Sequence, residues 1–191
     1  TNHRNTLEIA RVAQYFYAGT DAGIPVLPTR RGRVPPYVIE YVDLEYFVTR
    51  IIRHAGKYPH DLIAVVTHNN KSQDAIKEKL EPACRNTRTR FECYRSENKT
   101  TVNFDRAGIL LLNIQSVKGL EFDCVLIADL HEHYICSNSV AHKMRLYVAT
   151  SRATDRLFVL YRRTGNCPLL AFLPGKDIVE RYTLNDQGTP S

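Results

Sequence analysis

The chain of 191 residues contains no tryptophan, one methionine and five cysteines. Because five is an odd number, the cysteines cannot all pair with one another, and reduced thiols are expected. No hydrophobic run approaches the roughly 18 residues of a membrane-spanning helix. Residues 1–4 do not resemble a signal peptide. The sequence therefore predicts a cytoplasmic protein with no membrane partner.

A phosphate-binding loop is also missing. The pattern Gly-x-x-x-x-Gly-Lys-Ser/Thr, whose backbone amides wrap nucleotide phosphates and whose hydroxyl helps to place Mg²⁺, does not occur anywhere in the sequence. The chain alone is therefore not expected to hold a triphosphate or to hydrolyse ATP.

The charge distribution gives a weak indication of a polyanionic partner. There are 26 basic and 20 acidic residues, a net charge of +6, which many proteins without such partners share. Within the basic segment 84–106, four of the arginines interleave with the aromatic residues Phe91 and Tyr94, namely Arg85, Arg88, Arg90 and Arg95. It predicts either a nucleic-acid surface or a solvated loop and an edge strand protected by charge.

Apolar runs and helical patterns alternate along the chain. Strands are predicted at 37–41, 62–66, 108–113, 124–128 and 156–161. Helices are predicted from Asn5, with Glu8 completing a capping box, to near Gly19, after an Asp43 cap, over Ser72–Leu80, and around Met144. This alternation predicts one α/β domain, a mostly parallel sheet with helices on both faces and functional loops at the carboxyl ends of the strands. The polar residues 184–191 are predicted to be a flexible tail.

A glycine turn lies between two of the apolar runs, in the segment Asn113–Phe122. Gly119 can adopt a positive φ, and Glu121 offers an acceptor for a hydroxyl such as a ribose oxygen. An ordinary turn glycine between a solvated Lys118 and a solvated Glu121 explains the same residues equally well.

The segment Met144–Ala153 carries two arginines. On a helix, Arg145 and Arg152 would share one face, opposite a buried stripe of Val140, Met144, Tyr147 and Val148. A guanidinium suits phosphate because its planar fork gives bidentate hydrogen bonds. A surface arginine paired with Asp155 is the simpler alternative.

One further group could hold a metal ion. His131, His133 and Cys136 lie close in sequence but lack a convincing fourth ligand, so a polar loop without metal is predicted.

Three segments in fixed order resemble the motifs of UvrD-like superfamily 1 helicases. Asn2–Ile9 resembles motif IV, the glycine turn Lys118-Gly119-Leu120-Glu121-Phe122 resembles motif V, and Tyr147–Ala153 resembles motif VI. The resemblance implies a three-layer RecA-like domain over residues 1–183, the second core domain of an ATP-driven DNA helicase or translocase. Because the sequence begins inside motif IV, an excised domain is expected. The basic segment 84–106 would be a reduced accessory insertion.

The resemblance also implies roles for individual residues. Arg4 and Arg152 would reach the γ-phosphate of ATP held with Mg²⁺ mainly by an N-terminal RecA-like domain, Arg152 as the arginine finger. Gly119 and Glu121 would contact the nucleotide, Glu121 at the ribose. Single-stranded DNA, moved 3′ to 5′, would lie near five residues: Gln115, Ser116, Lys118, His68 and Asn69.

Some positions depart from the family pattern. Gln115 stands where the family often has His, so a hydrogen bond to DNA is kept but ring stacking is lost. Asn113 stands for a usual Thr, and His68 for a usual Arg. A non-catalytic DNA- or partner-binding module, or an unrelated α/β domain with coincidental motifs, is the alternative. The motor interpretation requires Arg4, Glu121 and Arg152 to converge.

Overall fold

The computed structural model describes residues 5–19, 23, 25–98, 102–136, 139–163 and 166–184. In these residues one sheet has the strand order β3-β4-β2-β5-β6-β1-β7, and every adjacent pair is parallel. The strands are β1 (Tyr37–Tyr41), β2 (Leu62–Thr67), β3 (Phe91–Cys93), β4 (Gly108–Asn113), β5 (Phe122–Ile127), β6 (Ala153–Arg162) and β7 (Glu180–Thr183). The α-helices are α1 (Leu7–Gln14), α2 (Leu44–Lys57), α3 (Asn70–Asn86) and α4 (Val140–Thr150), with short 3₁₀ turns η1 (Ser96–Asn98), η2 (Ile114–Ser116), η3 (Leu130–Cys136) and η4 (Pro168–Phe172).

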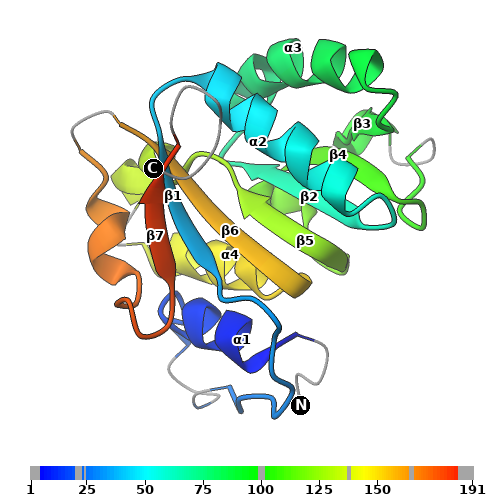
Figure 1. Cartoon of the computed structure of the whole chain (residues 1–191). Helices are drawn as coiled ribbons and strands as arrows, with labels where there is room; N and C mark the ends of the chain where they lie inside the picture. The colour runs from blue at the N-terminus through cyan, green and yellow to red at the C-terminus, as the bar shows by residue number, and fades with distance from the viewer. Residues whose placement is uncertain are drawn as a thin grey trace.

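Helices cover both faces of the sheet, as Figure 1 shows. Alternate residues of each central strand point to opposite faces, so Ile63 and Val65 pack with α2 and α3. Ala64 and Val66 pack in the other core cluster, with α1 and α4. The predicted fold class, a three-layer α/β domain, is confirmed.

The first helix differs from its predicted form. Thr6, not Asn5, caps α1, because its hydroxyl accepts a hydrogen bond from the backbone N–H of Ile9. The Glu8 carboxylate accepts from the backbone N–H of Gly32 at 2.7 Å instead of closing a capping box. The helix ends at Gln14, well before Gly19. The first turn of α1 is therefore held by the loop around Gly32.

Two short strands lie at the sides of the sheet: β3, which the sequence predicted as one alternative for the basic segment, and β7, which it did not predict. β3 lies inside the basic segment 84–106 and forms one edge of the sheet. Its charges are paired locally: Arg90 lies 2.8 Å from Glu92, and Arg95 contacts Asp74. The charge-protected edge strand is thus the arrangement that the structure shows. At the other edge, β7 is followed by Leu184, which is buried and donates its backbone N–H to the carbonyl of Glu40.

None of the helices described is long and apolar enough to cross a membrane.

Candidate functional site

The segment 114–121, which contains the glycine turn, connects the two ends of the parallel strands. We call these the carboxyl edge, where the strands finish, and the amino edge, where they begin. β4 ends at the carboxyl edge, and β5 begins at the amino edge because both strands run parallel to β2 between them. Residues 114–121 therefore cross one face of the sheet, held by buried Ile114 and Val117. A six-residue strand is about 20 Å long, so the two ends of this segment lie far apart. The predicted placement of the whole loop at the carboxyl edge is wrong.

Four of the five residues expected to contact DNA lie at the carboxyl edge, and Lys118, which directly precedes Gly119, does not. Asn113 ends β4, and its side-chain amide donates to Asn70 Oδ1 at 2.9 Å, at the start of α3. Ser116 donates its hydroxyl to Asn113 Oδ1 at 3.2 Å. Asn69 caps α3 by accepting from the N–H of Ser72. The segments after β2 and β4 thus lie side by side.

The residues expected to contact DNA differ in how far their side chains are exposed. Gln115 and Lys118 are exposed, whereas His68 is half-buried. Its ring lies against the rings of His133 and His142, with ring centres 4.5 and 5.5 Å away. His68 is therefore packed into the domain, unlike Gln115.

The residues expected to contact the nucleotide meet at the amino edge. Gly119 has a φ of +84°, which completes the turn. Glu121 is exposed and directly precedes β5. The backbone N–H of Phe122 donates to the carbonyl of Arg152 at 3.0 Å. Glu121 and Arg152 therefore flank the first rung of the β5–β6 pair (Phe122↔Ala153) and lie on neighbouring strands.

Arg152 lies beyond the end of α4, not on it. The helix ends at Thr150, and the buried stripe consists of His142, Leu146, Ala149 and Thr150. The predicted stripe is wrong, since Val140 is 60% exposed. The shared helical face for Arg145 and Arg152 is likewise wrong. Asp155, the alternative partner of Arg152, instead pairs with Arg30.

The guanidinium of Arg152 is partly enclosed. Its Nε is buried and has no hydrogen-bond partner among the residues that the structure describes. Tyr147 is close enough for the Arg152 charge to act on it: burial raises the pKa of Tyr147, and Arg152 opposes that rise. Tyr17 packs edge-on against Tyr147, with ring centres 5.1 Å apart. Arg152, which lies near Tyr147, can thus still donate a hydrogen bond from its Nε.

Arg4 lies outside the described residues, but its neighbour Asn5 does not. Asn5 and Ser151 line the same small cavity, of about 10 Å³, together with Tyr147. Asn5 is 1% exposed, and neither polar atom of its side chain finds a partner within the described part of the chain. The chain at Asn5 thus lies close to Ser151, the residue before Arg152.

A histidine cluster that sequence reasoning missed lies at the carboxyl edge. His133 Nδ1 is 2.8 Å from His142 Nε2, and His133 Nε2 is 3.2 Å from Asp129 Oδ1. His131 points elsewhere, accepting from the N–H of Arg162. The side chain of Cys136 lies outside the described residues. The sequence held one sign of this cluster: His68 and Asp129 each follow a buried strand, and those two strands are neighbours in the sheet.

Burial governs the protonation of this cluster. Burial and the neighbouring His133 and His68 rings lower the pKa of His142 to about 4. Burial and His133 also lower the pKa of His68. Burial alone would raise the pKa of Asp129, but hydrogen bonds from His133 and from the His68 backbone outweigh it, and that pKa is lowered. At neutral pH the cluster therefore holds uncharged His68 and His142 rings around one carboxylate.

Comparisons with known proteins bear on these residues. Residues 108–160, which include Gly119, Glu121 and Arg152, match the UvrD-like helicase C-terminal domain. The resemblance seen in the sequence is thereby confirmed. No curated protein sequence matches the chain.

Two solved structures share the fold. The C-terminal domain of a possible DNA helicase from Lactobacillus plantarum is 17% identical, with a TM-score of 0.69, over 95% of this chain and 99% of that one. The DUF1998 helicase MrfA, solved bound to DNA, is 16% identical, with a TM-score of 0.51, over 82% of this chain and 26% of that one. The architecture is therefore that of helicase C-terminal domains.

Proposed function

We propose that this chain is the C-terminal motor domain of an ATP-dependent DNA helicase or translocase. The observation that carries the proposal is the meeting of Glu121 and Arg152 at the amino edge of β5 and β6. Both belong to the segment that matches the UvrD-like C-terminal domain. A carboxylate can accept a hydrogen bond from the ribose of a nucleotide, and a guanidinium with an unused N–H can donate to its terminal phosphate.

In this proposal the triphosphate and Mg²⁺ are held mainly by an N-terminal RecA-like domain, which docks against the amino edge. Arg152 stabilises the charge that develops on the transferred phosphoryl group, an effect that contributes about 10³ to 10⁵ in rate in other phosphoryl-transfer proteins. Glu121 accepts from a ribose hydroxyl, and Gly119 lets the backbone approach the nucleotide. Arg4 joins Arg152 from the start of the chain.

Single-stranded DNA would lie at the carboxyl edge. Gln115 and Ser116 follow β4 there, beside Asn69 after β2, and these side chains offer hydrogen-bond donors to a phosphate backbone. Lys118 directly precedes Gly119 and therefore lies toward the amino edge. His68 contributes less than its sequence position implies, because its ring is packed against His133. Nucleotide and DNA would thus occupy opposite edges of one sheet, joined by residues 114–121.

The test is a substitution of Arg152 in the full-length protein. Arg152→Ala should leave ATP binding within a few-fold of the parent but lower kcat by about 10³ or more. Arg145→Ala is the matched control, since Arg145 is exposed on α4, and it should retain parental turnover. Unchanged turnover in Arg152→Ala would end the arginine-finger assignment.

A further inference from the structure

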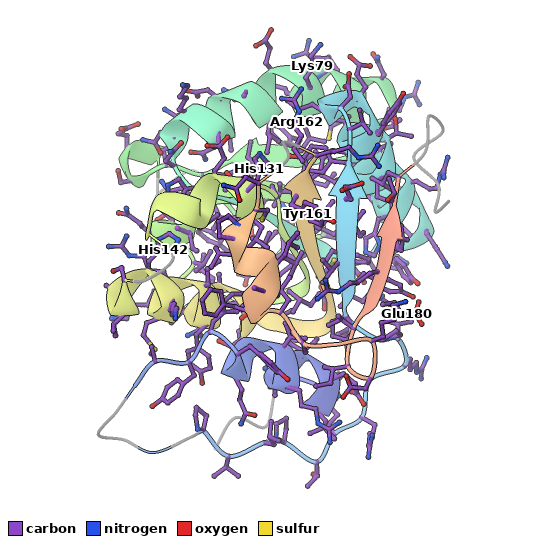
Figure 2. All side chains as sticks on the ribbon, turned by 90° about the vertical axis from the view of Figure 1, so that its left-hand side faces the viewer. Lys79, His131, His142, Tyr161, Arg162 and Glu180 are labelled. Atoms are coloured by element: carbon purple, nitrogen blue, oxygen red, sulfur yellow. The ribbon has the colours of Figure 1, made fainter. Side chains whose placement is uncertain are left out.

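Three histidines from separate parts of the chain converge at the carboxyl edge. His68 follows β2, His133 lies in η3, and His142 lies in the first turn of α4. One ring nitrogen from each lies within 4.8 Å of the others. His142 is labelled in Figure 2, on the helix that flanks this edge. Such spacing is close to that of ligands around a single ion.

The hydrogen bond from Asp129 fixes which nitrogen His133 can offer. His133 Nε2 lies 3.2 Å from Asp129 Oδ1, so the Nε2–H donates to the carboxylate. Its Nδ1 then carries no hydrogen, and the lone pair of this atom faces His142 Nε2. Asp129 is itself held by the backbone N–H of His68, at 2.8 and 3.0 Å. A carboxylate that orients an imidazole in this way is the usual outer partner of a metal-binding histidine.

One nitrogen of the cluster is left without a partner. His68 Nδ1 is buried and forms no hydrogen bond to any residue within the described ranges. His133 and His142 are 1% and 3% exposed, so bulk water does not reach their rings. A buried polar atom normally finds a partner, and an ion would supply one.

We propose that His68, His133 and His142 bind a Zn²⁺ ion, with Asp129 as the outer hydrogen-bond partner of His133. Imidazole nitrogen suits zinc, whereas Mg²⁺ and Ca²⁺ prefer oxygen ligands. Tetrahedral zinc with bonds of about 2.0–2.1 Å places its nitrogens about 3.4 Å apart. On binding, the 2.8 Å contact between His133 and His142 would lengthen by less than 1 Å, and nitrogen separations of up to 4.8 Å elsewhere in the cluster would shorten. A fourth position is left for water or another ligand.

The ion would cross-link three elements of the chain. It ties η3 and the start of α4 to the end of β2, next to Asn69, the cap of α3. The site is separate from the nucleotide edge, so the inference does not rest on the proposed function. Zinc binding would stabilise the edge that carries Asn69 and Asn113, whether or not the chain is part of a motor.

The test is zinc titration of the untagged 191-residue chain after chelator treatment, in competition with a chromophoric chelator. The parent chain should bind one Zn²⁺ per molecule. Asp129→Asn should weaken binding by about 10–100-fold, and His142→Gln by more than that. His60→Gln is the control, because His60 is exposed and precedes β2, whereas His68 follows it at the other end of the strand; it should match the parent.

A second measurement separates loss of ligand from loss of fold. Co²⁺ should give the intense visible absorption of a tetrahedral site in the parent and in His60→Gln, but not in His142→Gln. Far-UV circular dichroism of the metal-free variants should coincide with that of the parent. Absence of zinc binding by the folded parent chain, or equal affinity in His142→Gln, would overturn the proposal and leave a hydrogen-bonded histidine cluster alone.

Discussion

Gly119 shows how a single residue shapes the site. Its φ of +84° lies in the left-handed region, where side chains with a Cβ are strained, but a Cβ built there would meet no atom within 4 Å. The requirement for glycine is therefore conformational and not steric. The sequence predicted this property correctly, because a glycine between two apolar strands is a turn signal whatever its function.

Replacing Gly119 tests that conclusion. Gly119→Ala should lower the free energy of unfolding by about 1–2 kcal/mol through backbone strain alone. Gly56→Ala is the matched control, since Gly56 lies in α2 and its added Cβ also meets open space. That control should be neutral or stabilising by up to about 1 kcal/mol. Urea unfolding of both variants measures the difference, and equal effects would contradict it.

At the scale of elements, β2, β4 and β5 were predicted within two residues at each end because their runs are continuously apolar. β7 escaped prediction, and β3 was predicted only as one alternative without bounds, because short edge strands carry charged and polar residues such as Glu92 and Arg181. For α4 the apolar pattern was misleading, since the helix buries His142 and Thr150 while exposing Val140. His142 finds its partner outside the helix, at His133, whereas the Thr150 hydroxyl donates to the carbonyl of Leu146 in its own helix.

The site was predicted in the same uneven way. Motif resemblance identified Glu121 and Arg152, which the structure brings to one edge. It did not reveal which edge, because a local pattern does not show that residues 114–121 must cross the sheet to reach a parallel neighbour. The cluster of His68, His133 and His142 was not predicted, since His68 is distant from the other two in sequence and becomes their neighbour only through strand order.

Helix α2 carries a buried histidine that should make stability depend on pH. Burial, with Arg50 and Arg156 nearby, lowers the pKa of His54 to about 3. The unfolded chain binds a proton at this residue near pH 6.5, whereas the folded chain does not. Stability from His54 is therefore complete above about pH 6.5 and is lost as the pH falls toward 3.

The corresponding measurement is urea unfolding between pH 7 and 5. His54 should contribute a loss of about 1 kcal/mol per pH unit below 6.5. In His54→Leu the free energy of unfolding should depend less steeply on pH by that amount, because leucine cannot bind a proton. Other buried histidines remain in both proteins, so only the difference in slope is assigned to His54. Identical slopes in parent and variant would contradict the burial effect.

At the scale of the whole molecule, one sheet presents chemically different edges. The amino edge gathers Glu121 and Arg152, and the carboxyl edge gathers Asn69, Asn113 and Gln115. Neither edge includes a phosphate-binding loop. A working ATPase would therefore need a second domain to hold the triphosphate.

The isolated 191-residue chain should accordingly hydrolyse no ATP, with or without single-stranded DNA. A coupled phosphate-release assay on the pure chain measures this directly, and the longer protein serves as the positive control. Turnover that survives repurification of the isolated chain would show that the residues present here are sufficient.

The most direct test of the two-edge account is a DNA titration of ATPase activity in the full-length protein, with one variant at each edge. Arg152→Ala should lower the maximal rate by about 10³ or more and leave DNA affinity unchanged. Gln115→Ala should raise the half-saturating concentration of single-stranded DNA while the basal rate is retained. If both variants lost rate and DNA affinity together, or if Arg152→Ala kept the parental rate, the account would be contradicted.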